Sequence, residues 1–199
     1  MNVAWLVLAV LIWGFIHSVL ASLETKAWFR SMLGDGVMRY YRFAYNVFSV
    51  LSFAPILLLM AFLSDRMLYQ IPTPWIYFFL IGQIGAAILL IVGVLQTDTL
   101  SFIGLRQLIE KEERSSKLVT TGLYRWIRHP LYTAGLLFIW LTPVVSLNSL
   151  IFFIALTIYI IMGANFEERK LEREFGSAYI EYKATTPMLI PRLAFGRNK

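Results

Sequence analysis

Residues 129–166 carry no Asp, Glu, Lys or Arg and read HPLYTAGLLFIWLTPVVSLNSLIFFIALTIYIIMGANF. This stretch is too long for one membrane-spanning helix, because roughly 20 helical residues cross a bilayer core of ~30 Å. Proline, serine and asparagine between Thr142 and Asn148 supply turn chemistry in its middle. We therefore expect a tight helical hairpin, with spans at about 131–145 and 148–165.

Three further windows without charged side chains lie upstream, at residues 1–23, 43–64 and 67–97. Each accommodates one span, which we place at about 2–22, 44–63 and 75–95. Hydrophobic residues make up 58% of the 199-residue chain and charged residues 15%. A soluble chain of this length cannot bury so much apolar surface. The sequence predicts an all-α polytopic membrane protein with five transmembrane helices, forming a single domain over 1–199.

The basic residues predict how the chain is oriented in the membrane. Seventeen of the 18 Lys and Arg lie in the first loop (about 23–43) or in the segments 96–130 and 166–199. Because basic loops remain cytoplasmic, we expect those segments in the cytoplasm and the N-terminus outside, in the inner membrane if the source is bacterial. Leu20-Ala21-Ser22 faintly resembles a signal-peptide cleavage site, but no basic residue precedes the apolar stretch, so we expect no cleavage.

Several classes of site are excluded by composition and motifs. The chain has no Cys, so disulfides, thiolate nucleophiles and Cys-ligated metals are absent, and two His are too few for an ordinary zinc site. We expect no bound metal. The net charge of +6 indicates topology and attraction to anionic lipid, and we expect the lipid bilayer rather than nucleic acid as a partner.

The first polar cluster precedes the hairpin. Pro130 suits the first position of a helix and disfavours helical geometry at His129. Arg128 and His129 are therefore expected at a helix N-terminus, where main-chain N–H groups also attract anions. Arg128 can bind a carboxylate in bidentate fashion. The alternative is that Arg128 extends to the membrane surface and His129 only packs.

The second polar cluster follows the hairpin. Glu167 and Glu168 lie at the end of the last span, where a carboxylate is costly without a partner and is a site candidate by default. The alternatives are a solvated helix or ion pairs with Arg128 or Arg169. Beyond them, spacings of four, four and three residues predict one packing face of a C-terminal amphipathic helix, formed by Leu171, Phe175, Tyr179 and Tyr182.

Two weaker candidates lie upstream. His17 and Ser18 are the only polar pair near the cytoplasmic end of the first span, and a packed histidine is the alternative interpretation. Asp98, Arg106 and Gln107 form a polar cluster that, taken alone, is typical of a loop.

These motifs together resemble those of a known family. Arg128-His129-Pro130-Leu131-Tyr132, then Glu167-Glu168 after one hairpin, then Phe175-Gly176 and Pro187 to Pro191, resemble the isoprenylcysteine carboxyl methyltransferase family and the wider phospholipid methyltransferase group. This resemblance covers about residues 97–192. Upstream, His17-Ser18 and Phe102 to Gln107 are similar to the methanethiol S-methyltransferase branch.

The resemblance implies an integral membrane methyltransferase that uses S-adenosylmethionine, with its cofactor site at the base of the hairpin. Leu118, Val119 and Tyr124 would lie along the nucleoside. The methionyl carboxylate and nearby polar atoms would be held by Arg128, His129 and Tyr132. The α-amino group, ribose hydroxyls or sulfonium would meet Glu167 and Glu168. The residues implied for catalysis or for the acceptor side are His129, Arg106, Gln107 and His17.

The resemblance leaves the methyl acceptor open. It implies a small or lipophilic acceptor, such as a thiol or an isoprenylcysteine-like carboxylate, and no obligate protein partner. A thiol reacts as a thiolate, so His129 or His17 is a candidate base, whereas a carboxylate needs none. The alternatives are an NADPH-dependent membrane reductase of the sterol type, which carries a similar R-H-P-x-Y piece, and a non-enzymatic membrane protein.

Overall fold

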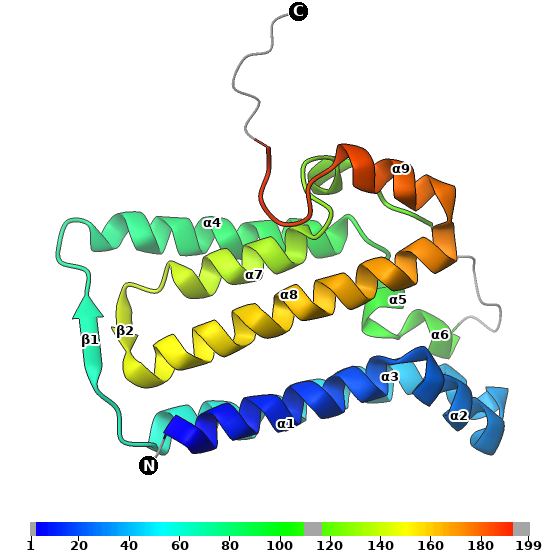
Figure 1. The fold of residues 1–199 in the computed structure, drawn as a ribbon, viewed down its shortest axis with the longest axis horizontal. Helices are drawn as coiled ribbons and strands as arrows, with labels where there is room; N and C mark the ends of the chain where they lie inside the picture. The colour runs from blue at the N-terminus through cyan, green and yellow to red at the C-terminus, as the bar shows by residue number, and fades with distance from the viewer. Residues whose placement is uncertain (1–2, 110–116, 193–199) are drawn as a thin grey trace, which may run out of the picture. The chain divides into compact units, whose positions relative to one another are not determined.

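The computed structural model describes residues 3–109 and 117–192, apart from the side chains of Phe102 and Gln107. The chain is mostly helical (Figure 1). Its helices are α1 (Val3–Ala21), α2 (Leu23–Leu33), α3 (Asp35–Phe62), α4 (Ile76–Leu95), α5 (Thr99–Ile103), α6 (Arg106–Ile109), the 3₁₀ turn η1 (Gly122–Arg125), α7 (Pro130–Trp140), α8 (Leu147–Phe175) and α9 (Ser177–Thr185). Two short strands, β1 (Met67–Gln70) and β2 (Val144–Ser146), pair antiparallel.

Four of the described helices, α1, α3, α4 and α8, are long and apolar enough to cross a membrane. The helical membrane architecture is therefore as predicted, but several bounds differ. Helix α3 begins at Asp35 rather than near 44, and α8 continues to Phe175 rather than ending near 165. Charge-free windows mark the lipid-facing part of a helix, and both helices extend beyond it into charged sequence. Helix α7 has 11 residues and rises about 16 Å, which is shorter than a bilayer core.

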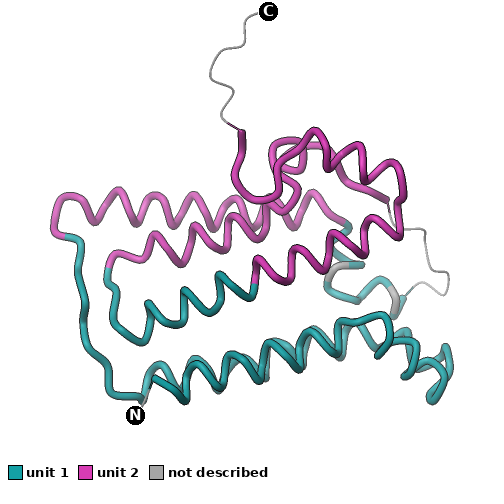
Figure 2. Tube along the Cα trace, viewed as in Figure 1, with its two compact units in different colours: residues 1–71, 98–115, 144–159 teal, residues 72–97, 116–143, 160–199 magenta. Residues whose placement is uncertain are grey.

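The chain forms two compact units, each assembled from three separate segments (Figure 2). Unit 1 comprises residues 1–71, 98–115 and 144–159, and unit 2 comprises residues 72–97, 116–143 and 160–199. Helix α8 belongs to unit 1 up to residue 159 and to unit 2 beyond it.

In unit 1, helices α1 and α3 pack together and α3 holds the short helices α5 and α6. The Trp13 indole donates a hydrogen bond to Ser52 Oγ at 3.1 Å. Three side chains of α3 donate to main-chain carbonyls at 2.6–2.7 Å: Arg39 to Leu108, Arg42 to Ser101 and Asn46 to Ile103. Gly104 joins α5 to α6 with φ +91, and a Cβ there would lie 2.6 Å from Phe43 N, so only glycine fits.

Unit 1 also contains the two-stranded sheet. Met67 pairs with Ser146, and Gln70 pairs with Val144. The sequence predicts only a tight turn over 142–148. The structure corrects this prediction, because strand β2 lies within that segment. After this strand, at the start of α8, the Asn148 N–H donates to the Asp65 carboxylate at 3.1 Å.

In unit 2, α7 packs along α4 (Figure 1), a partner that the sequence did not predict. A Cβ on Gly82 or Gly93 of α4 would lie 2.8 Å or 2.7 Å from the Leu141 or Leu131 side chain, respectively. Small residues allow membrane helices to approach closely. Gln83 donates to the Phe138 carbonyl at 3.0 Å, which ties the two helices together.

A C-terminal helix is present, but the predicted continuous packing face is wrong, because the helix is broken at Gly176. Its φ of +56 ends α8 at Phe175, and α9 starts at Ser177. The four residues of the predicted packing face are therefore divided between two helices, with Leu171 and Phe175 on α8 and Tyr179 and Tyr182 on α9.

Candidate active site

The site in unit 2 begins where the chain enters α7. Pro130 is the first residue of that helix, as predicted, and His129 precedes it with non-helical φ −121 and ψ 65. The Arg128 and His129 N–H groups donate to the carbonyls of Pro187 and Met188 at 2.9 and 3.1 Å. These main-chain bonds hold the C-terminal segment against the start of α7.

The Arg128 guanidinium is buried and fully engaged by the protein. Its side chain is 8% exposed, and its Nε donates to Glu168 Oε1 at 2.7 Å while Nη2 contacts the same oxygen. Its Nη1 donates to the main-chain carbonyls of Lys183, at 3.1 Å, and of Thr186. Arg128 thereby connects α7 to α8, to α9 and to the segment after α9.

Glu168 is buried at the centre of this network. Its second oxygen lies 3.1 Å from Lys183 Nζ, and Lys183 also contacts Glu172 at 2.8 Å. The hydrogen bonds that the Lys183 ammonium donates to Glu172 and Glu168 raise its pKa. His129 Nε2 lies 3.3 Å from Glu168 Oε1. We call Arg128, Glu168, Lys183 and Glu172 the ion-pair network, in which two cations meet two carboxylates; Arg128 and Glu168 are buried, whereas the Lys183 side chain is 42% exposed.

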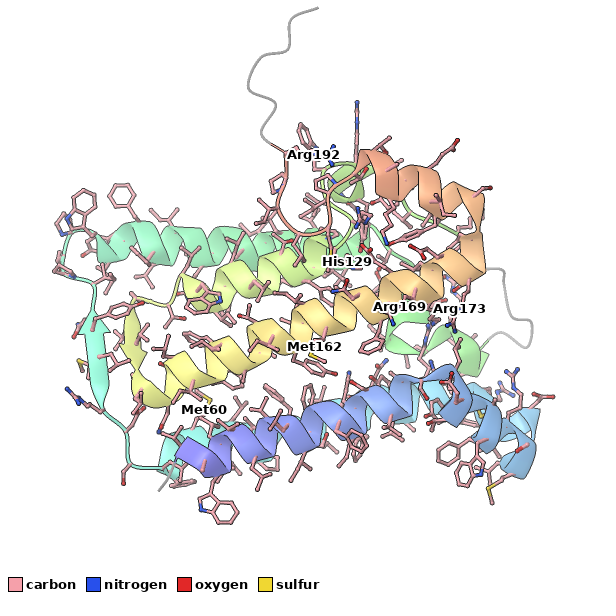
Figure 3. All side chains as sticks on the ribbon, in the orientation of Figure 1. Met60, His129, Met162, Arg169, Arg173 and Arg192 are labelled. Carbon is pink, nitrogen blue, oxygen red and sulfur yellow. The ribbon has the colours of Figure 1, made fainter. Side chains whose placement is uncertain are left out.

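Glu167 lies next to Glu168 in sequence but has a different environment. Successive side chains of a helix point about 100° apart, and the Glu167 side chain is 44% exposed. Its Oε2 accepts a hydrogen bond from the Tyr132 hydroxyl at 2.7 Å and lies 3.7 Å from His129 Nδ1. The Tyr132 ring stacks on His129, with centroids 5.3 Å apart. Figure 3 shows His129 at the start of α7.

The protonation of His129 follows from its surroundings. Burial lowers the pKa of its imidazole from 6.5, against the opposing pull of Glu167 and Glu168, so the ring is neutral at pH 7. A neutral ring donates from one nitrogen only, and the ion-paired Glu168 carboxylate can only accept. Nε2 therefore carries the proton, and Nδ1 presents a lone pair beside the Glu167 carboxylate. Two hydrogen-bond acceptors side by side suit a cationic donor such as an ammonium group.

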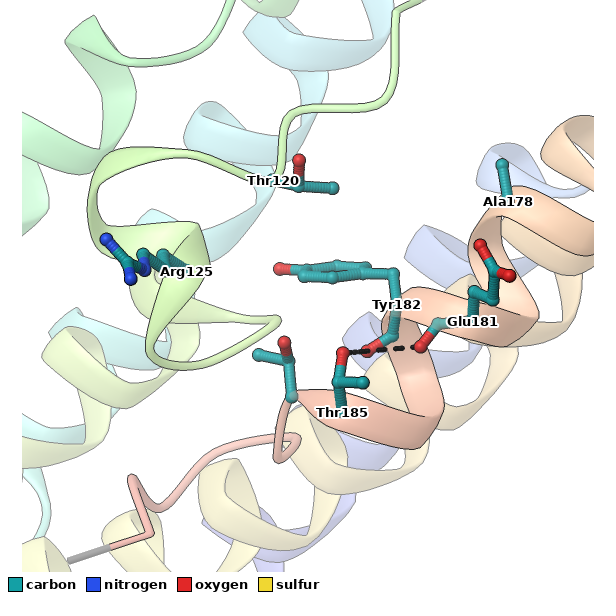
Figure 4. A pocket seen from close by; sticks show the side chains of 7 residues that line it. Thr120, Arg125, Ala178, Glu181, Tyr182 and Thr185 are labelled. Carbon is teal, nitrogen blue, oxygen red and sulfur yellow. Dashed lines mark hydrogen bonds between the residues drawn. The ribbon is translucent and has the colours of Figure 1, made fainter. Parts of the chain in front are cut away.

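An open hollow of about 580 Å³ lies in the same unit (Figure 4). Its lining includes Thr120, Arg125, Glu181 and Thr185, none of which was a candidate from the sequence, together with Tyr182. They come from η1, α9 and the loop before η1, so no single periodic pattern identifies them.

The three residues predicted to lie along the nucleoside are in or beside the chain segment that borders this hollow. Leu118 and Val119 are half-buried and directly precede Thr120. The Tyr124 carbonyl accepts from the Tyr182 hydroxyl, and burial raises the pKa of the Tyr124 side chain to about 12, with the Glu167 charge adding to the rise.

The structure thus brings together Arg128, His129, Tyr132, Glu167 and Glu168. Two other candidates belong to unit 1: His17 lies 2.6 Å from the Tyr45 hydroxyl, and Arg106 pairs with Asp98 at 2.9 Å. The Gln107 side chain lies outside the described part of the structure. Sequence reasoning missed Lys183, because its partners lie on another helix and no local spacing joins them.

Comparison with known proteins identifies the family. Residues 81–178 match the model of the phospholipid methyltransferase family, and this segment contains every member of the cluster around His129. The chain is 31% identical to a methanethiol S-methyltransferase of Crocosphaera subtropica, over 88% of this chain and 69% of the relative. It is 33% identical to methanethiol S-methyltransferase 2 of Bradyrhizobium diazoefficiens, over 92% of this chain and 70% of the relative.

No solved structure matches the chain. The methyltransferase relatives favour the interpretation of the chain as a methyltransferase over a reductase or a non-enzymatic protein. Together with the four apolar helices, the sequence matches show that the chain belongs to the phospholipid methyltransferase family and is a membrane methyltransferase.

Proposed function

We propose that the protein transfers a methyl group from S-adenosylmethionine to a small thiol at the cytoplasmic face of a membrane. The thiol is supported by the relatives, which are named for methanethiol. The cytoplasmic face is supported by the distribution of basic residues, which favours five crossings with α7 forming part of the fourth. The observation that carries the cofactor assignment is the pair of acceptors formed by Glu167 and His129 Nδ1.

The chemistry of the cofactor fits this pair. S-adenosylmethionine has an α-ammonium group and a sulfonium, and both are stabilised by a nearby carboxylate. Glu167 is exposed enough to meet a ligand, and the Tyr132 hydroxyl fixes the position of its carboxylate. We assign the α-ammonium to Glu167 and Nδ1, with the nucleoside in the hollow beside Thr120 and Arg125.

The same contacts support a role for Arg128 and Glu168 that differs from the one first expected. The resemblance implies that Arg128 holds the methionyl carboxylate and Glu168 a cationic part of the cofactor. In the structure each is engaged by other groups of the chain. We propose that they position α7, α8 and α9 around the ligand rather than touch it.

When bound, S-adenosylmethionine supplies a methyl group on a positively charged sulfur. The residues of this chain bind and orient the two reactants and exclude water, which is the main requirement for an in-line displacement. A thiol acceptor releases its proton and attacks as the thiolate. In this assignment Nδ1 of His129 serves binding, so the proton passes to solvent.

The cofactor assignment is tested by thermal unfolding of the detergent-purified chain with S-adenosylhomocysteine, the expected product. Wild-type protein should be stabilised in a saturable, concentration-dependent manner. Glu167→Gln should weaken binding by about tenfold or more, because a charge-assisted hydrogen bond is lost. The matched control is Glu174→Gln, which removes the same charge farther along α8 and should leave the affinity for S-adenosylhomocysteine unchanged. No shift in wild type, or equal weakening in both variants, would overturn the assignment.

The acceptor is tested separately by product formation. With methanethiol, we expect dimethyl sulfide in the headspace by gas chromatography and no methyl ester on an isoprenylated cysteine analogue. Ester formation without dimethyl sulfide would overturn the thiol while leaving the cofactor site intact.

A further inference from the structure

Unit 1 contains a second polar pocket, distinct from the cluster around His129. It has a volume of about 180 Å³ and is lined by Lys26, Tyr41, Arg42, Tyr45 and Asn46. Lys26, Arg42 and the Asn46 amide supply hydrogen-bond donors, and among the described lining residues none is a carboxylate. Such a lining recognises an anion with several oxygens, of which phosphate is the common biological example.

The lining of this pocket is held in place by the surrounding helices. Arg42 Nη1 donates to the Ser101 carbonyl and Asn46 Nδ2 to the Ile103 carbonyl, each at 2.7 Å. The Tyr41 hydroxyl donates to the Leu20 carbonyl at 2.6 Å. These contacts fix the side chains before a ligand arrives, which lowers the entropic cost of binding.

The position of the pocket in the chain indicates the source of the anion. Lys26 is on α2, which joins the candidate spans α1 and α3 with one residue on either side. A helix between two spans lies at the membrane surface, at the level of the lipid headgroups. Helix α2 also exposes the apolar side chains of Leu23, Trp28 and Met32, and tryptophan is enriched at this level.

We propose that this pocket binds the phosphate of an anionic phospholipid, with Lys26 and Arg42 as the cationic contacts. The basic lining complements the negative headgroup, and apolar side chains on the same helix are available to the acyl chains. This is a lipid-binding site that the methyl-transfer function does not require.

The site is tested by native mass spectrometry of the full chain in mild detergent. Phosphatidylglycerol is compared with phosphatidylcholine of the same acyl chains, in wild type, Lys26→Gln and Arg30→Gln. Both substitutions remove one positive charge from α2, but Arg30 does not line the pocket. We expect one retained phosphatidylglycerol per chain, about fivefold weaker binding in Lys26→Gln, and a change below about twofold in Arg30→Gln.

Several results would overturn the proposal. They are equal retention of the two lipids, equal weakening in both variants, or Lys26-dependent binding of inorganic phosphate without binding of lipid. Lys26→Arg keeps the charge and should keep the lipid, so loss in this variant as well would also count against the site. Thermal unfolding without lipid shows whether Lys26→Gln still folds. If it does not, lipid retention by Lys26→Arg tests the site instead. None of these readouts depends on methyl transfer.

Discussion

The chain has two histidines, one in each unit, and their surroundings differ in charge. His17 lies in an aromatic environment, stacked on Trp13 at 4.8 Å, with its Nε2 2.6 Å from the Tyr45 hydroxyl. In the described structure its Nδ1 is buried and has no hydrogen-bond partner. His129 has a carboxylate near each ring nitrogen, Glu168 at 3.3 Å and Glu167 at 3.7 Å.

This difference separates a packed histidine from one suited to bind a charged ligand. The contacts of His17 are neutral, so they stabilise the packing of α1 on α3. On one side of His129 lies Glu168, which is buried and paired with Arg128. On the other side lies the exposed carboxylate of Glu167. Of the two histidines, His129 is the one that we propose lies beside a bound cation, and the predictions below test this contrast.

The largest effect is expected from Glu168→Ala. The substitution leaves the buried Arg128 guanidinium without its counter-charge, and breaking such a pair costs about 3–5 kcal/mol. Unfolding of the purified protein by denaturant measures the loss. Glu167→Ala, at an exposed neighbour, should cost less than about 1 kcal/mol. A similar loss of stability in the two variants would contradict the proposal that Glu168 supports the fold and Glu167 binds the ligand.

The next effect concerns ligand affinity at the two histidines. His129→Ala removes the lone pair beside Glu167 and the ring that stacks on Tyr132, so S-adenosylhomocysteine affinity should fall about tenfold. His17→Ala should change it less than about twofold. Isothermal titration calorimetry measures both. A larger loss at His17 would assign that histidine to the site and reverse the contrast.

A smaller effect is expected from Tyr45→Phe. The substitution removes the hydroxyl that contacts His17 and should lower the free energy of unfolding by about 1 kcal/mol without changing ligand affinity. Tyr132→Phe should show the opposite pattern, since its hydroxyl bonds to the exposed Glu167. Thermal unfolding with and without S-adenosylhomocysteine distinguishes the two patterns, and equal behaviour would contradict the assignment.

The smallest effect is a pH dependence carried by His129. Because burial lowers the pKa of the folded-state imidazole, the unfolded chain binds the proton first as the pH falls below 6.5. The His129 contribution to stability is therefore unchanged above that pH, and stability is lost as the pH falls toward the folded-state pKa. His129→Gln should decline less steeply than wild type between about pH 7 and 5.5, and identical slopes would contradict the neutral ring.

Much of the site was predictable because its residues obey local rules. Pro130 specifies a helix start, and this places Arg128 and His129 immediately before the first turn of α7. Glu167 and Glu168 were candidates because a carboxylate at the end of an apolar stretch needs a partner. Their different environments were not predictable, because the burial of one face of α8 depends on Arg128 and Lys183, which are distant in sequence.

The sequence by itself determined that the chain is helical and membrane-embedded, with its polar chemistry gathered in a few short segments. Hydrophobicity and charge are local properties, and both act through the bilayer without reference to the rest of the fold. Only the tertiary structure decided that α7 packs on α4, that β1 pairs with β2 and that Gly176 separates α9 from α8. It also decided that Glu168 is enclosed while Glu167 is exposed, because contacts between distant segments determine which face of a helix is covered.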